Sequence, residues 1–257
     1  MIDRVSRVIA ARTDFAIVEE TEDWIVVDKP APLIVHPTNK KQEPTLLDEL
    51  RMSLERRGER SEGLSIINRL DRETSGLVLV ARTQVAARTF GKAMMRRGIG
   101  KAYRAIVTGW PEWEERRVES PILRQGEVGE TAIWLKQVVH AEGKASVTTL
   151  QVERRFARPE GRFSLLRVGT ETGRMHQIRV HCAHVGHAIV GDKIYGPDER
   201  CYLEFMERGW TGGLATMLHL ERQALHAFWM EVEWGGERRA WEAALPEDLA
   251  GFLEGGC

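Results

Sequence analysis

Short runs of β-branched and aromatic residues recur along the chain and predict the strands of a sheet. Residues 24–28 form one such run, and residues 77–81 predict a buried strand because Leu-Val-Leu-Val-Ala has no polar position. The same composition predicts strands at residues 103–107, 147–153 and 163–168. Predicted strands outnumber predicted helices, which favours a mixed α/β protein built around a sheet.

Two helices are predicted from residue spacing and end signals. Thr83 can cap a helix that runs to about Arg97, where Gly98 would stop it. Apolar residues recur at helical spacing over residues 174–185, and Gly186 stands where a helix end often has glycine. No repeat, low-complexity tract or long linker separates these elements.

The length and the loop positions favour one compact domain with inserted loops. At 257 residues the chain is long enough for one large domain or two small ones. The least patterned parts are residues 37–44, 55–62 and 110–129.

Cysteine usage and hydropathy predict a cytoplasmic protein. The three cysteines, Cys182, Cys201 and Cys257, lack the paired spacing of a disulfide framework, which fits a reducing compartment. No apolar run approaches the roughly 20 residues of a membrane helix. The N-terminal segment also lacks the apolar region of a secretion signal. We therefore expect no membrane contact.

Charge is distributed unevenly along a chain whose formal net charge is −1. Residues 51–104 carry thirteen Lys and Arg against five acids, whereas residues 231–257 carry seven acids against two arginines. Such asymmetry suits a protein that presents a basic face to RNA phosphates. For the arginines of residues 51–60, an ordinary solvated surface is an equal alternative.

One acid among arginines marks the most informative segment, IINRLDRETSGLVLVA at residues 66–81. Asp71 stands between Arg69 and Arg72 and precedes Thr-Ser-Gly and the buried strand. Neighbouring positive charge favours the ionised carboxylate, so Asp71 is a candidate nucleophile. The alternative is a solvated turn in which Asp and Ser bond their own backbone.

This segment resembles the HRLDxxTSG signature of the RluA-type pseudouridine synthases. Further blocks match the family in the same order, and together they are far more specific than one motif. They lie at residues 26–30 and 35–37, 101–105, 173–181, 186–192 and 222–227. Two positions depart from the family pattern: Asn68 stands where His is usual, and Ala31-Pro32 replaces Ala-Gly. Neither change removes a group that must do chemistry.

The resemblance implies a fold and a reaction. It implies the α/β pseudouridine synthase fold, with a mainly antiparallel central sheet, flanking helices and loops, and a catalytic cleft across the sheet. It implies isomerisation of specific uridines to pseudouridine in ribosomal or transfer RNA, without a cofactor. The blocks begin so early that we expect a single catalytic domain over residues 1–257, with no separate N-terminal RNA-binding domain. A monomer is expected.

The resemblance also assigns roles to seven residues. Asp71 matches the nucleophile, Tyr103 the tyrosine that lies against the target base and can accept a proton, and Arg179 the arginine that pairs with the catalytic acid. Four further residues match or neighbour family positions that contact RNA. Arg69 would fill the gap left by the flipped base or steer its phosphate, while phosphate or base contacts are an even alternative to surface solvation for Arg72, Arg174 and His176.

Parts of the sequence are also compatible with three other functions. A zinc site is disfavoured because His176 and His184 would lie about 12 Å apart along a helix, and no acid completes an HExxH pattern, so no metal is expected. A glycosidase generally needs two acids flanking the bond, and the matched active-site blocks offer no second acid beside Asp71 apart from Glu73 and Asp192. A non-catalytic RNA-binding or ribosome-assembly protein on the same fold is the remaining alternative, motivated by Asn68.

Overall fold

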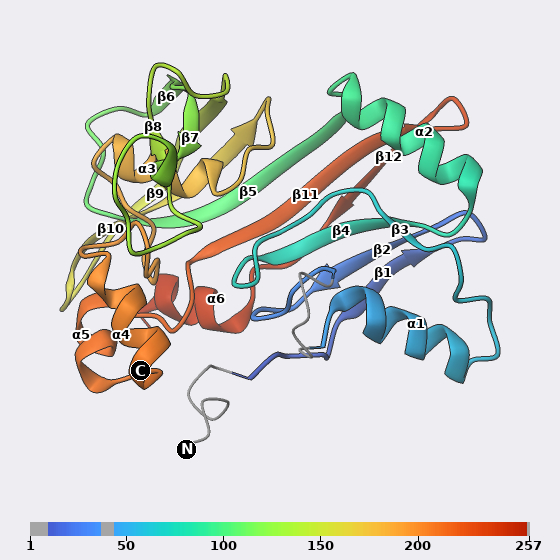
Figure 1. Cartoon of the computed structure of the whole chain (residues 1–257), viewed down its shortest axis with the longest axis horizontal. Coiled ribbons are helices and arrows are strands. Elements are labelled where there is room, and N and C mark those ends of the chain that lie inside the picture. Colours follow the sequence, from blue (N-terminus) through green and yellow to red (C-terminus); the bar gives the residue numbers. More distant parts are fainter. Residues whose placement is uncertain (1–9, 37–43, 256–257) are drawn as a thin grey trace. The chain divides into compact units, whose positions relative to one another are not determined.

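The computed structural model describes residues 10–36 and 44–255, which fall into two compact units (Figure 1). The N-terminal unit comprises residues 10–102 and 226–246, and the central unit comprises residues 103–225 and 247–255. The chain passes between the units within strands β5 (Ile99–Thr108) and β11 (Leu225–Trp234), and again between residues 246 and 247. The expectation of a single catalytic domain stays a prediction.

The N-terminal unit is built on strands in the order β1-β2-β4-β11. Strands β1, β2 and β4 pair antiparallel, β3 pairs with β4, β12 pairs with β11, and β11 meets β4 in parallel. The bounds are β1 Ala16–Glu20, β2 Trp24–Lys29, β3 Ser65–Ile66, β4 Ser75–Ala81 and β12 Glu237–Glu242. All seven residues of β4 are buried, as expected for a central strand.

Side-chain alternation along β2 and β4 divides the core of this unit between two helices. Val26 and Leu79 pack in one apolar cluster with Phe90 of α2 (Gln84–Met95). Val27 and Val80 pack in another with Leu50 of α1 (Leu46–Arg56). Successive strand residues point to opposite faces, so each helix covers one face of the sheet (Figure 1).

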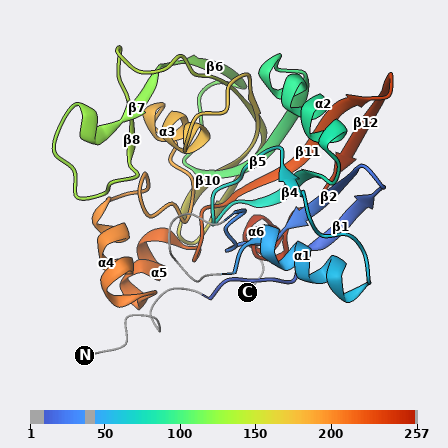
Figure 2. The same ribbon diagram turned by 45° about the vertical axis from the view of Figure 1, so that its right-hand side comes forward.

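The central unit holds the remaining strands and four helices. Its strands run in the order β5-β10-β9-β6, and β7 and β8 form a separate antiparallel pair. Figure 2 shows α3 beside β7 and β8, with α4 and α5 packed on each other. The bounds are β6 Glu115–Glu119, β7 Ile122–Arg124, β8 Gln137–Val139, β9 Val147–Arg158, β10 Gly161–Thr170, α3 Gln177–His184, α4 Arg200–Arg208, α5 Gly212–Leu218 and α6 Glu247–Glu254; a 3₁₀ turn spans Gln125–Glu127.

The predicted fold class is confirmed: the protein is mixed α/β with a mostly antiparallel sheet. All five predicted strands are present, and the Thr83 hydroxyl caps α2 by accepting from the Ala86 amide. The helix predicted over residues 174–185 begins later, at Gln177, because His176 is in the left-handed conformation with φ 56°. Gly186 follows it with φ 86°, as its position predicted.

Two of the three unpatterned stretches are more regular than expected. Helix α1 continues to Arg56, and strands β6 and β7 lie within residues 110–129. Residues 37–43 and Cys257 lie outside the described residues. Cys182 and Cys201 are buried free thiols. Within the described part of the chain, no helix is long and apolar enough to cross a membrane.

Candidate active-site residues

The segment before β4 carries Asp71 and is fixed to that strand by a buried side chain. The Asn68 amide donates to the Leu77 carbonyl at 3.0 Å and accepts from the Leu79 amide at 2.8 Å. The Thr74 amide donates to the Asp71 carbonyl at 3.1 Å, which closes a turn. A turn, which was the alternative interpretation of this segment, is therefore present. It is anchored to the core, and Asp71 itself is half-buried.

A buried lysine supports the same segment from the side of β2. Lys29 has no solvent exposure, and its ammonium donates to the carbonyls of Pro30 at 3.0 Å, Leu33 at 2.9 Å and Arg72 at 3.4 Å. The Arg72 carbonyl also accepts from the Leu33 amide at 2.8 Å. The Lys-Pro block thus fixes the backbone next to Asp71. Sequence reasoning matched this block to the family without finding that role.

The Ser-Gly pair at the start of β4 meets the block at residues 222–227. Gly76 has φ 114°, and a Cβ there would lie 2.2 Å from the carbonyl oxygen of Ala227. The Ser75 hydroxyl is 3.0 Å from Nδ1 of His226. In the sheet, His226 lies opposite Ser75 and Ala227 opposite Gly76, in parallel pairing. Two segments about 150 positions apart thereby fix where the Asp71 loop enters the sheet.

Arg179 lies on α3 of the central unit and is held by a carboxylate that sequence reasoning did not assign to it. Its Nε and Nη2 donate to the two carboxylate oxygens of Asp192 at 2.6 and 2.9 Å. Both side chains are buried, at 7% and 0% exposure. Asp192 also accepts from the amides of Ile194 and Tyr195, each at 3.0 Å. A planar guanidinium fork bound in this way has one orientation.

The charge on Asp192 is stabilised despite complete burial. Burial alone would raise the pKa of this carboxyl, but the Arg179 charge and hydrogen bonds, with two backbone amides, lower it below its ordinary value. Asp192 is therefore ionised at neutral pH. The expected pairing of Arg179 with Asp71 stays a prediction, and Asp192 is its bidentate partner within the central unit.

Tyr195 joins Arg179 to His176. The Arg179 guanidinium carbon lies 5.0 Å from the centre of the Tyr195 ring, a cation–π distance. The Tyr195 hydroxyl is 2.8 Å from His176 Nδ1 and accepts from the Gln137 amide at 2.8 Å. The left-handed backbone of His176 directs the ring to this hydroxyl from the start of α3. Two predicted residues thus share one cluster around a tyrosine that was not predicted.

The other predicted residues are divided between the two units. Arg69, which is exposed, and Arg72, which is half-buried, flank Asp71 in the N-terminal unit. Tyr103 lies on β5 in the central unit and is 9% exposed. Arg174 is exposed in the central unit, where its Nε donates to the Ala145 carbonyl at 3.3 Å. Convergence of Asp71, Tyr103 and Arg179 stays a prediction.

His181 on α3 and His187 just after that helix have protein partners. His181 is buried, with Nδ1 2.8 Å from the Thr148 hydroxyl and Nε2 2.9 Å from the Ser120 carbonyl. Its pKa is lowered because burial disfavours the charged ring. His187 Nδ1 is 2.9 Å from the Thr108 carbonyl. Among the described residues, no group of three His, Cys, Asp or Glu side chains is arranged to hold a metal ion.

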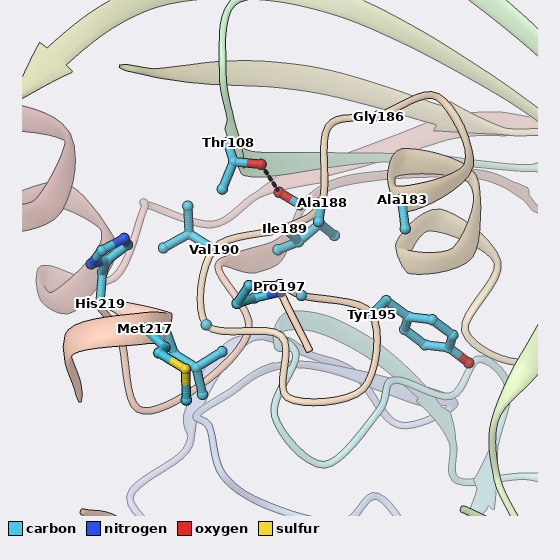
Figure 3. Close-up of a pocket in the computed structure, with 13 residues that line it drawn as sticks. Thr108, Ala183, Gly186, Ala188, Ile189, Val190, Tyr195, Pro197, Met217 and His219 are labelled. Atoms are coloured by element: carbon cyan, nitrogen blue, oxygen red, sulfur yellow. Dashed lines mark hydrogen bonds between the residues drawn. The ribbon is translucent and has the colours of Figure 1, made fainter. Parts of the chain in front are cut away.

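A cavity of about 350 Å³ opens in the central unit beside this cluster (Figure 3). Its wall is largely apolar and includes Ala188, Val190 and Pro197, while Tyr195 lies at one end and His219 at the other. The Thr108 hydroxyl donates to the Ala188 carbonyl at 3.3 Å, so its proton is used within the protein (Figure 3). None of the seven predicted site residues lines it.

Comparison with known proteins identifies the family. The family model described as RNA pseudouridylate synthase matches residues 23–184, which contain all seven predicted site residues. Ribosomal large subunit pseudouridine synthase D of Pseudomonas aeruginosa is 34% identical over 253 residues, covering 95% of this chain and 72% of that protein.

Two solved human structures share the fold. RNA Pseudouridylate Synthase Domain Containing 4 aligns with a TM-score of 0.72 at 22% identity, covering 94% of this chain and 92% of that chain. RNA Pseudouridylate Synthase Domain Containing 1 aligns with a TM-score of 0.67 at 24% identity, covering 95% of this chain and 94% of that chain. With the sequence matches, these results confirm the resemblance: the chain belongs to the RNA pseudouridylate synthase family, as an RNA pseudouridine synthase of the RluA type.

Proposed function

We propose that this enzyme isomerises uridines of ribosomal RNA and that Asp71 is its nucleophile. Ribosomal RNA is favoured over transfer RNA because relatives at 31 to 34% identity are named ribosomal large subunit pseudouridine synthases. The observation that supports Asp71 most strongly is its anchoring. Asn68, Lys29 and the turn to Thr74 hold the backbone around one half-buried carboxylate.

The reaction rearranges bonds without net oxidation. The bond from ribose C1′ to uracil N1 breaks, a bond from C1′ to C5 forms, C5 loses a proton and N1 gains one. Asp71 attacks the sugar or the ring, or stabilises charge as the glycosidic bond breaks. Tyr103 lies against the base and accepts the C5 proton. The balance requires no redox partner, so we propose a reaction without a cofactor.

Arg179 would act on Asp71 through the edge of its guanidinium that Asp192 does not occupy. Nε and Nη2 bind Asp192, so Nη1 lies on the remaining side of the fork. A buried arginine fixed in this way favours an ionised carboxylate opposite that edge. Asp192 and Tyr195 are then positioning residues, because they act through Arg179. We propose Arg69, Arg72, Arg174 and His176 as RNA contacts, with His176 set by Tyr195.

The substrate class is tested by tritium release from RNA labelled at uridine C5. Ribosomal and transfer RNA would be prepared from a host that lacks this enzyme and incubated separately with it. We expect release from ribosomal RNA alone. Release from transfer RNA alone would contradict the proposed substrate while leaving the enzyme class intact. The proposed monomer and cytoplasmic location are tested separately, by light scattering and by cell fractionation.

A further inference from the structure

The basic surplus predicted for residues 51–104 is not spread evenly over the N-terminal unit. Around α1, arginines are paired with acids: Arg57 binds Glu20 at 2.8 and 2.9 Å, and Arg82 binds Glu20 and Glu59 at 3.0 and 2.8 Å. Arg51 lies 3.6 Å from Asp48. Most arginines of residues 51–60 therefore have an acid nearby; the exception is Arg56, which is exposed and donates to the Met52 carbonyl at 3.2 Å.

Helix α2 differs because its cations face solvent without acids. Arg88, Lys92 and Arg96 are exposed, and none forms an ion pair within the part of the chain that the structure describes. The helix sequence QVAARTFGKAMM contains no acid. On the adjacent β11–β12 hairpin, Glu231 faces Arg238 at 3.5 Å and Glu237 faces Arg239 at 2.7 Å. Those two carboxylates therefore have arginines of their own.

The three cations form one row. They stand four residues apart, so each lies about 6 Å further along the axis than the one before it, and all three share one side of the helix. The opposite side carries Ala86 and Phe90, which are fully buried in the apolar cluster under α2. Packing of that inner side fixes the direction of the outer row. We call Arg88, Lys92 and Arg96 the α2 ridge.

Stabilisation of the helix dipole does not account for the ridge. Basic side chains interact favourably with the dipole of a helix only within its last turn. Lys92 and Arg96 stand near that end of α2, but Arg88 stands in its first half. Three exposed cations without acidic partners also repel one another unless a polyanion neutralises them.

We propose that the α2 ridge binds the phosphate backbone of the substrate RNA and makes no contact with the target base. This inference rests on the proposed function, because RNA is the polyanion that the enzyme must hold. The ridge carries no aromatic side chain for base stacking and no amide for base-edge recognition. Its contacts therefore add affinity and orientation and carry no sequence preference.

The test compares two triple variants with the same change in charge. Arg88→Gln, Lys92→Gln and Arg96→Gln together remove the ridge. Arg60→Gln, Arg238→Gln and Arg239→Gln remove three exposed cations of the same unit, each of which has an acidic neighbour. Affinity for a fluorescein-labelled ribosomal RNA transcript would be measured by anisotropy between about 50 and about 200 mM salt.

Loss of the ridge should raise Kd about tenfold or more at low salt and reduce the slope of log K against log salt by about 2 to 3, for three lost phosphate contacts. The control should stay within about twofold of wild type. A third variant, Arg88→Lys with Arg96→Lys, should keep wild-type affinity, because a phosphate contact needs the charge more than the guanidinium shape.

Tritium release by the wild type on the same RNA separates the two claims. If the wild type isomerises the RNA and the ridge variant binds with unchanged Kd and slope, the ridge inference is wrong and the proposed function stands. Equal losses in the ridge and control variants would also overturn it, because net charge would then explain both. If the wild type neither binds nor isomerises ribosomal RNA, the proposed function fails and the inference falls with it.

Discussion

At the scale of single residues, the orientation of Arg179 depends on two hydrogen bonds from its guanidinium to the buried carboxylate of Asp192. Arg179 was matched to the family arginine, yet its bidentate partner Asp192 stands thirteen positions further on, in a different block. Spacing along the chain gives no sign that this segment folds back onto α3. The sequence did not single out Tyr195 either, because an isolated Tyr more often fills a core than a functional site. Asn68 was noted as a departure, and the structure shows it bonded to the backbone of β4.

Replacing Asp192 with Asn should lower both stability and activity. The change leaves a buried arginine without its counter-charge, which typically costs about 3 to 5 kcal/mol. Chemical denaturation measures the loss, and kcat/KM for tritium release should fall as well, because Arg179 loses its fixed orientation. Asp198→Asn is the matched control, since Asp198 pairs with the exposed Arg200. Equal effects of the two substitutions would contradict the positioning role.

The same carboxylate predicts a dependence of stability on pH. The pKa of Asp192 is lower in the folded protein than its ordinary value. Its contribution to stability is therefore complete above the unfolded-state pKa and is lost as pH falls through the lower, folded-state pKa. The unfolding free energy of the wild type should decline below about pH 4, and Asp192→Asn should flatten that decline. Parallel wild-type and variant curves would contradict the assignment.

Asn68→Ala should destabilise the loop that carries Asp71. The substitution leaves the buried Leu79 amide and Leu77 carbonyl without this partner, and each unsatisfied group costs about 1 to 3 kcal/mol. Hydrogen exchange at residues 67–74 should accelerate, and kcat should fall more than KM rises. Exchange rates and kcat equal to those of the wild type would show that other contacts suffice to hold the loop.

At the scale of elements, alternation and composition predicted the strands well, whereas helix boundaries depended on contacts that the sequence does not reveal. Leu46, Leu50 and Leu54 of α1 recur every four residues, but the charged stretch after them hid this signal. Helix α3 starts late because His176 bonds Tyr195 from a left-handed backbone. The parallel contact of β4 with β11 joins distant segments, and only the glycine in Thr-Ser-Gly hinted at a close backbone approach.

Gly76→Ala should disrupt the junction of β4 and β11. A Cβ 2.2 Å from a backbone carbonyl oxygen forces the strands apart, and φ 114° adds backbone strain. We expect a loss of more than about 3 kcal/mol of unfolding free energy, or no folded protein. Gly91→Ala on α2 is the control: its Cβ meets no atom within 4 Å, so a gain of about 0.5 to 1 kcal/mol is expected. A Gly76→Ala protein as stable as wild type would contradict the close approach.

At the scale of the whole molecule, the sequence predicted the family and the reaction class, because six motif blocks in order carry more information than any local pattern. The structure adds the supports within each unit: Lys29, Asn68 and His226 around the Asp71 loop, and Asp192 and Tyr195 around Arg179. It also pairs Arg57 and Arg82 with Glu20, an acid far from both along the chain, whereas Arg88 and Lys92 on α2 form no ion pair within the described residues.

The most direct test of the central claim is tritium release from C5-labelled ribosomal RNA by the wild type and by Asp71→Asn. The substitution keeps the size of the side chain and removes the nucleophilic carboxylate, so melting temperature and RNA affinity should stay close to wild type. We predict release by the wild type and none above background by Asp71→Asn. Full turnover by a correctly folded Asp71→Asn protein would contradict the assignment of Asp71 as the nucleophile.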